Sequence, residues 1–232
     1  MAKLTILSGG AAHGLVTALA PQFKSATGVE IDATFGAVGA MRDKLIAGAP
    51  ADMLILTAAL IGTLVQSGHV MAGSTADLGT VATGIAVRSG DPAPAVHDAD
   101  TLRTALRAAD AIYFPDPKLA TAGIHFAKVL DRLGIAAEVA SRLRPHPNGN
   151  AAMAALAAGH GGYPIGCTQV TEILGTPGVT LVADLPADFA LATTYTLGIC
   201  ATAQDVKLAH KFAALLTGEV SRELRRKLGF GA

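Results

Sequence analysis

The sequence predicts an α/β fold in which strands and helices alternate along the chain. Short apolar runs recur, glycine- or proline-containing turns end them, and most are followed by a segment with helical spacing of apolar residues. The 232 residues, 51% hydrophobic and only 16% charged, can bury a sizeable core in one or two domains. This alternation is typical of mostly parallel sheets covered by helices.

Each predicted element rests on its pattern and its boundary residues. In chain order, the expected strands are residues 4–7, 28–35, 51–56, 81–87, 111–114, 164–167, 179–182 and 193–201. The expected helices run from residue 12 to Phe23, over 41–48, from Thr57 through Val65, to Ala108, over 121–133 and 151–158, and over 205–216 and 219–228, with a further segment at 168–174.

Four boundary signals support these helices. Gly48 and Pro50 end the second helix, and Thr57 is the expected N-cap of the third. Asp100 or Thr101 is the expected N-cap of the helix that ends at Ala108.

The turn after the first strand predicts an anion site. The strand breaks at glycines and opens a helix, so backbone N–H groups and the positive end of the helix dipole face open space. A second loop of this type follows at residues 35–41, and two such loops suggest one small anion held between them. An ordinary strand-to-helix turn is the alternative at the first loop. The expected ligand contacts here are Ser8, Gly9, Gly10, Ala11, Ala12, Val38 and Gly39.

Other strand ends and helix starts extend this candidate site. A hydroxyl at a strand end can bind ligand or cap the next helix, and residues 148–150 can lend amide donors or cap the helix that follows. The expected contacts are Thr57, Ala122, Gly123, Asn150, Thr168 and Gln169.

Four ionisable residues lie one turn or less inside these loops. His13 and Glu172 are the catalytic candidates if the protein is an enzyme, with Glu172 as a general base if it is partly buried. A solvent-facing position is the alternative for both. Arg42 can pair with a carboxylate or lie on the surface, and His125 is ambiguous in the same way as His13.

Composition excludes several classes of function. Lys plus Arg and Asp plus Glu are 18 each, and Trp is absent, which argues against a nucleic-acid partner. No apolar stretch reaches 18 residues, so no membrane insertion is expected. Without a CxxC or Cys/His spacing, no metal and no cofactor is expected. Cys167 and Cys200 are expected as small buried hydrophobes, with a disulfide left open.

The loops, taken together, resemble type 2 periplasmic binding proteins, in particular the molybdate-binding branch. Besides the two glycine loops, the match includes the Ala-Gly-Ala-Pro-Ala-Asp run at residues 47–52, Asp116-Pro117 with Ala122-Gly123, and residues 164–166. The resemblance implies two α/β lobes with a ligand cleft between them and hinge closure on the ligand. Lobe one is residues 1–82 plus 195–232, and lobe two is residues 83–194.

The chain departs from that family at its hydroxyl donors. Molybdate-binding relatives place serines near Ala11 and Ala12 and near Val38 and Gly39, and a tyrosine near Gln169. A lost hydrogen bond to a charged group costs roughly 1.5–3 kcal/mol. The resemblance and these departures together predict a site suited to another anion, such as a carboxylate.

The residues and the resemblance together predict two alternative functions. The first is a solute-binding protein for a small oxyanion or carboxylate that serves an ABC-type membrane transporter. The alternative is an isomerase of a small unsaturated carboxylic acid, resembling aconitate isomerase. Residues 1–3 lead into a strand without an apolar signal segment, so the chain as written is expected in the cytoplasm, or in the periplasm if a leader was removed.

Overall fold

The computed structural model describes residues 3–231, in which the chain forms two compact α/β units. Unit 1 takes in the chain up to Val81 and again from Thr193, and unit 2 is Ala82–Ala192. The expectation about a leader at Met1 and Ala2 lies outside the described residues. None of the helices within residues 3–231 combines the length and the apolar character needed to cross a membrane.

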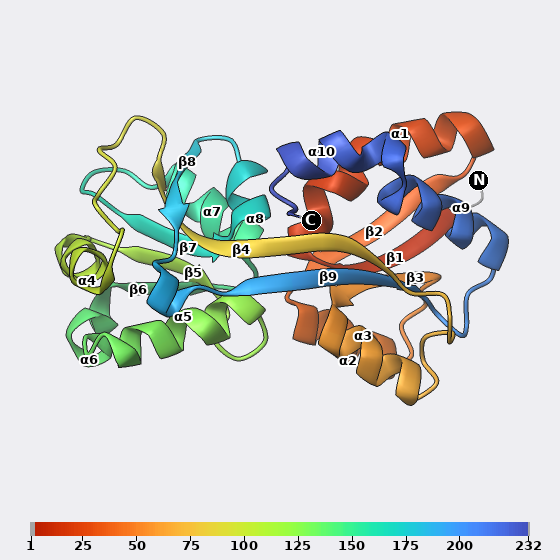
Figure 1. Cartoon of the computed structure of the whole chain (residues 1–232), viewed down its shortest axis with the longest axis horizontal. Helices are drawn as coiled ribbons and strands as arrows, with labels where there is room; N and C mark the ends of the chain where they lie inside the picture. The colour runs from red at the N-terminus through yellow and green to blue at the C-terminus, as the bar shows by residue number, and fades with distance from the viewer. Residues whose placement is uncertain (1–2, 232) are drawn as a thin grey trace. The chain divides into compact units, whose positions relative to one another are not determined.

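Unit 1 is built on a sheet in the order β2–β1–β3–β9. The strands β1 (Lys3–Gly9), β2 (Glu30–Gly36) and β3 (Met53–Thr57) run parallel, and β9 (Ala192–Ile199) runs antiparallel to β3. The helices α1 (His13–Thr27) and α9 (Val206–Thr217) cover one face, and α2 (Val38–Ile46) and α3 (Ala58–Gln66) cover the other (Figure 1).

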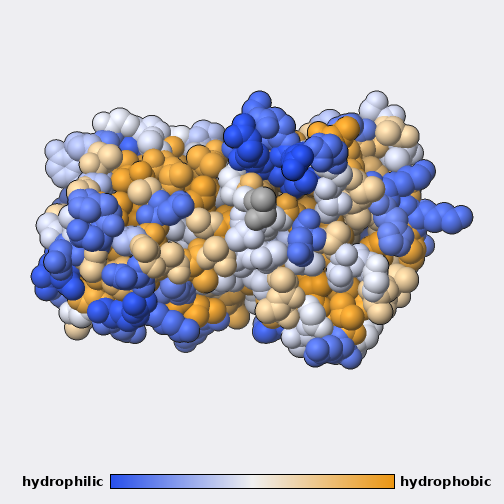
Figure 2. Space-filling model, viewed as in Figure 1, coloured by the Kyte–Doolittle hydropathy of each residue, from blue (hydrophilic) through white to orange (hydrophobic). Residues whose placement is uncertain are grey.

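The C-terminal segment completes unit 1. A short turn, η4 (Glu219–Ser221), leads into α10 (Arg222–Lys227), whose sequence RELRRK exposes Arg222, Glu223, Arg226 and Lys227. Figure 2, in the view of Figure 1, shows a hydrophilic cluster at the top of the molecule where α10 lies. The helices α1 and α9 pack together, and the rings of Phe23 and Phe212 meet edge to face with centroids 4.9 Å apart.

Unit 2 is built on the part of β4 (Ala76–Arg88) from Ala82 onward and on β5 (Ile112–Pro115), β6 (Leu143–His146), β7 (Ile165–Gln169) and β8 (Val179–Asp184). β6, β5 and β7 run parallel, and β4 pairs antiparallel with both β7 and β8. One face carries α7 (Gly149–Ala158) and α8 (Val170–Leu174), and the other carries α4 (Ala99–Ala108), α5 (Thr121–Arg132) and α6 (Ala136–Val139) (Figure 1). Short 3₁₀ turns η1 (Gly10–Ala12), η2 (Ala140–Arg142) and η3 (Ala187–Phe189) complete the described elements.

The predicted α/β fold class is confirmed, and most elements lie within a few residues of their predicted bounds. The expected N-cap of α4 is wrong, because Asp98 caps the helix by accepting the N–H of Thr101 at 2.8 Å. Thr101 is the reciprocal partner of this capping box, since its hydroxyl accepts the N–H of Asp98. The strand β6 and the helix α6 were not predicted; four-residue elements carry little periodic signal.

Candidate anion-binding loops

The two glycine loops of unit 1 lie side by side. Gly9 at the end of β1 pairs in register with Gly36 at the end of β2. A Cβ on Gly9 would lie 2.7 Å from Cγ1 of Val38, so the first loop packs directly against the start of α2. Parallel pairing of β1 and β2 therefore brings the two helix starts to one edge of the sheet.

The helices that follow these loops differ from most other long helices in how they begin. Among the described helices of eight or more residues, α3, α4, α7 and α9 each begin with a side chain that accepts a backbone N–H. The helices α1, α2 and α5 begin without a side-chain cap and without an acidic residue in the first turn. The starts of α2 and α5 follow Ala37 and Ala120, and α1 continues the 3₁₀ turn of residues 10–12, whose cap residue Gly9 also offers no side chain; all three coincide with predicted anion loops.

These uncapped starts are buried rather than solvated. Ala11, Ala12, Val38, Ala122 and Gly123 are all buried. Buried helix N–H groups need an acceptor, from either the protein or a ligand. An anion is the acceptor that the helix dipole favours.

Side-chain hydroxyls contribute little at the unit 1 loops. Ser8 is fully buried, and its hydroxyl donates to the carbonyl of Gly9 at 2.9 Å, as the backbone-satisfied alternative predicts. Thr57 caps α3 as predicted, accepting the N–H of Leu60 at 3.4 Å, so its own hydroxyl proton is not used in that contact.

The two ionisable candidates of unit 1 have different environments. His13 is the half-buried first residue of α1, and its ring meets Phe35 edge to face with centroids 4.6 Å apart. Arg42 is ion-paired with Asp43 at 2.7 Å and is partly exposed, which fits its surface alternative.

In unit 2, the start of α5 packs tightly on the end of β5. A Cβ on Gly123 would lie 2.2 Å from the carbonyl oxygen of Pro115 and 2.3 Å from that of Asp116. Only glycine fits this approach, which brings the helix start onto the strand end. His125, one turn further on, is tied to the carbonyl of Phe189 through Nε2 at 2.7 Å.

The start of α7 has its own acceptors. Asn148 caps the helix by accepting the N–H of Ala151 at 2.9 Å, so the capping alternative at this turn is confirmed. The carboxylate of Glu172 reaches the same helix start from α8, where it accepts hydrogen bonds from the backbone N–H groups of Gly149 and Asn150.

The surface alternative for Glu172 is wrong, because the side chain is buried. Its Oε2 accepts the hydroxyl of Thr168 at 2.5 Å, and the N–H of Gln169 also hydrogen bonds to the carboxylate. Burial raises the pKa of Glu172 to about 7, while these hydrogen bonds oppose the rise. A carboxyl with this pKa is half ionised near neutral pH.

Unit 2 also holds polar atoms without partners. Within residues 3–231, the buried side-chain atoms that lack a hydrogen-bond partner are, in unit 2, the amide nitrogen and oxygen of Gln169 and the hydroxyls of Thr83 and Thr171, and, in unit 1, the hydroxyl of Thr193. Thr83 and Gln169 are directly opposed in the β4–β7 ladder and are 1% and 2% exposed. The sequence analysis named Gln169 but not the threonines. Threonine is ordinary in a strand, where Thr83 and Thr193 lie, and nothing local marks Thr171 in α8.

The sequence model of a family described as bacterial extracellular solute-binding protein matches residues 4–231. The chain belongs to this family. It is 26% identical to an aconitate isomerase of Pseudomonas sp. over 222 residues, covering 93% of this chain and 82% of that one. It is 22% identical to the molybdate-binding protein ModA of Escherichia coli K12 over 230 residues, covering 98% and 88%.

The fold of this solute-binding protein is shared with solved relatives. The periplasmic molybdate-binding protein of Azotobacter vinelandii superposes with a TM-score of 0.80 at 18% identity, covering 99% of each chain. The predicted fold, the two-lobed α/β fold of the type 2 periplasmic binding proteins, is thereby confirmed.

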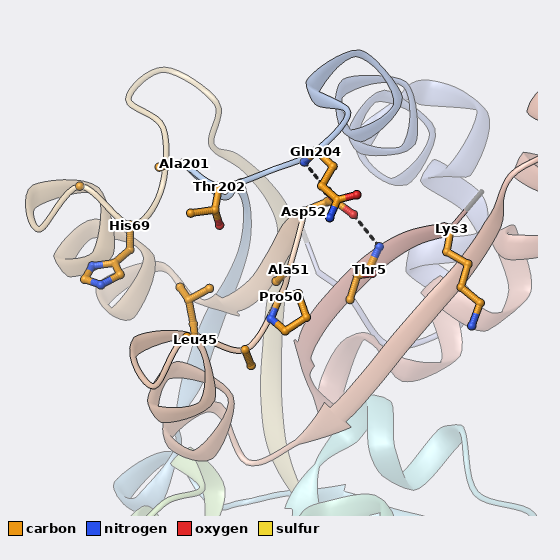
Figure 3. Close-up of a pocket in the computed structure, with 13 residues that line it drawn as sticks. Lys3, Thr5, Leu45, Pro50, Ala51, Asp52, His69, Ala201, Thr202 and Gln204 are labelled. Carbon is orange, nitrogen blue, oxygen red and sulfur yellow. Dashed lines mark hydrogen bonds between the residues drawn. The ribbon is translucent and has the colours of Figure 1, made fainter. Parts of the chain in front are cut away.

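This solute-binding protein also has a cavity of about 560 Å³ in unit 1, at the opposite edge of the sheet from the uncapped helices. Figure 3 shows Asp52 in its wall, where Oδ2 accepts the N–H of Thr5 and Oδ1 accepts the N–H of Gln204, both at 2.8 Å. The carboxylate at the end of the Ala-Gly-Ala-Pro-Ala-Asp run therefore joins β1, β3 and the segment before α9.

Proposed function

We propose that this protein binds a small anion in unit 1, at the neighbouring N-termini of α1 and α2 that lack a side-chain cap, and that the start of α5 is a second candidate anion site within unit 2. One observation carries the proposal. The long helices that lack a protein cap are those whose starts follow the glycine-containing and alanine-containing loops, while the other long helices cap themselves. At a buried helix start without a side-chain cap, an anion is a favourable acceptor for the backbone N–H groups.

A carboxylate is the favoured ligand class. Ala11, Ala12, Val38 and Gly39 offer backbone N–H groups but no hydroxyl, so a tetrahedral oxyanion would lose donors on several oxygens. A planar carboxylate has only two oxygens to satisfy at each helix start. The Pseudomonas relative is named for a tricarboxylate and the E. coli relative for an oxyanion, which supports an anionic ligand in both cases.

We further propose that the anion is collected outside the cytoplasm and delivered to an ABC-type membrane transporter. The family is described as extracellular and solute-binding, which supports this role.

The decisive experiment places a carboxylate of the protein where the ligand's charge is proposed to bind. Ala37 has the extended backbone of an N-cap (φ −61°, ψ 139°), so Ala37→Asp can cap α2 itself. We expect wild-type protein to bind a carboxylate from a panel of cis-aconitate, citrate, succinate, molybdate and sulfate. Ala37→Asp should lose at least tenfold in that affinity by calorimetry.

Two controls make this experiment specific. Ala37→Ser supplies a neutral cap and should bind within about threefold of wild type, because only the charge is excluded. Ala201→Asp adds the same charge to the exposed loop after β9, at the opposite sheet edge, and should bind like wild type. Equal affinity in Ala37→Asp and wild type, or no binding of any panel anion, would overturn the proposal.

A second candidate function is isomerisation of a small unsaturated carboxylic acid. The observation that favours it is the buried Glu172, whose pKa of about 7 suits a general base. The 26% identity to an aconitate isomerase also supports it. The test is proton NMR of cis-aconitate incubated with the protein in D2O. Deuterium incorporation that Glu172→Gln or His13→Ala abolishes would support the enzyme; tight binding without exchange over hours would exclude it.

A further inference from the structure

The surroundings of Glu172 have the composition of an anion site that is already filled. Four donors converge on this carboxylate: the Thr168 hydroxyl and the backbone N–H groups of Gly149, Asn150 and Gln169. Two of these N–H groups open α7, a helix of ten residues. Backbone N–H groups at a helix start joined by a hydroxyl are the usual means of binding a free anion.

The local packing is built around the carboxylate. A Cβ on Gly149 would lie 1.9 Å from Oε2 of Glu172 and 2.1 Å from Oγ1 of Thr168. The carboxylate therefore occupies the space that any side chain at position 149 would need. Glu172 itself is only 5% exposed.

This arrangement changes what unit 2 can offer a ligand. The sequence predicts Asn150 and Thr168 as ligand contacts, but the Asn150 N–H and the Thr168 hydroxyl are engaged by Glu172. Among the described residues of unit 2, the buried side-chain atoms without a hydrogen-bond partner are all neutral, namely the Gln169 amide and the hydroxyls of Thr83 and Thr171.

We propose that Glu172 is a built-in anion that closes the start of α7 to charged ligand groups, and thereby disfavours compact dianions such as molybdate and sulfate. Above pH 7, where Glu172 is mostly ionised, a dianion that approached this helix start would face a like charge in a poorly solvated site. A hydroxyl group of a carboxylate ligand is neutral and does not meet this repulsion. The first part of this proposal, the closure of the α7 start by Glu172, rests on the geometry of unit 2 alone. The second part, the selectivity against dianions, also rests on the proposed function.

The closure is tested by anion rescue at pH 8. Glu172→Ala empties the site, and we expect sodium formate at 100 mM to raise its unfolding midpoint by about 3 °C or more relative to equal sodium chloride. Wild type and Glu138→Ala, which loses an exposed carboxylate paired with Arg107, should show no formate-specific shift. Equal shifts in all three proteins, or none in Glu172→Ala, would overturn the closure.

The selectivity is tested with the isosteric Glu172→Gln, which also serves if Glu172→Ala does not fold. We expect this variant to bind molybdate or sulfate at least tenfold more tightly than wild type in calorimetry, with carboxylate affinity changed less. An unchanged ratio of dianion to carboxylate affinity would refute the selectivity. If neither protein binds any anion, the proposed function and the selectivity fail together, while formate rescue still decides the closure.

Discussion

At Glu172, burial and hydrogen bonding act on one carboxyl in opposite directions. Burial favours the neutral acid, and four donors favour the carboxylate, with burial the larger effect. The unfolded chain titrates this group near the ordinary 4.5 and the folded protein near 7. Between these values the folded state holds a proton that the unfolded state releases, so stability falls as pH rises and levels off above about 7.

We therefore predict a pH-dependent loss of stability that Glu172→Gln removes. The wild type should lose roughly 3 kcal/mol or less of unfolding free energy between pH 4.5 and 7.5 through this group. Urea unfolding at pH 5, 6, 7 and 8 measures the slope, which should be shallower in Glu172→Gln and unchanged in Glu138→Gln. Parallel slopes for wild type and Glu172→Gln would show that the carboxyl titrates normally.

Gln169 presents the opposite situation, a neutral side chain whose nitrogen and oxygen are both buried without a partner. An unsatisfied buried polar group costs about 1–3 kcal/mol. We predict that Gln169→Met leaves the ligand-free protein as stable as wild type or up to about 2 kcal/mol more stable in urea, while its anion affinity falls. Thr83→Val should have the same effects on ligand-free stability and on anion affinity. A clear loss of ligand-free stability in both would indicate that these groups stabilise the fold rather than the ligand.

At the scale of elements, the helix starts divide into self-capped and uncapped groups. Thr57 was correctly predicted as a cap, whereas the cap of α4 was assigned to Asp100 or Thr101 when it is Asp98. Capping signals are short-range, and neighbouring polar residues compete for the same role within one turn. The missing caps of α1, α2 and α5 are visible in the sequence only as alanines before each helix.

The starts of α1 and α2 carry no side-chain hydroxyl, and we therefore expect weak binding of oxyanions. We predict that wild type binds molybdate weakly or not at all, and that Ala11→Ser or Ala12→Ser raises the affinity about tenfold or more by restoring a hydroxyl donor. Serine is close to alanine in size, so either buried position can accept it. Ala203→Ser, beyond β9, is the matched control. Sub-micromolar molybdate binding by wild type in calorimetry would show that backbone donors suffice.

At the scale of the whole molecule, each unit carries one buried free cysteine, Cys200 in unit 1 and Cys167 in unit 2. The expectation of two buried hydrophobes is thereby confirmed. Burial raises the pKa of the Cys200 thiol to about 12 and raises that of Cys167 further, so neither reacts while folded. Each thiol is therefore a reporter for the opening of its own unit.

We predict that a carboxylate ligand at 100 times its dissociation constant slows thiol labelling by up to about 100-fold. Cys167→Ala and Cys200→Ala leave one reporter in each variant, and labelling with a thiol reagent is followed over time. Protection of both thiols is expected if the ligand stabilises both units. Protection of Cys200 alone would mean that the anion binds unit 1 only.

The sequence by itself determined the fold class, the family and the position of most helix starts. The fold class and the helix starts follow from hydrophobic periodicity and turn residues within windows of a few residues. The family follows from the resemblance of the loop motifs to known members. Tertiary structure alone decided the state of Glu172, which the sequence left as either a surface helix residue or a partly buried base. Its carboxylate is buried because α8 packs beside α7, whose start lies more than twenty residues earlier, and because Gly149 leaves room for it. Such a fit depends on side-chain volumes that meet only in the folded chain, and no local pattern records it.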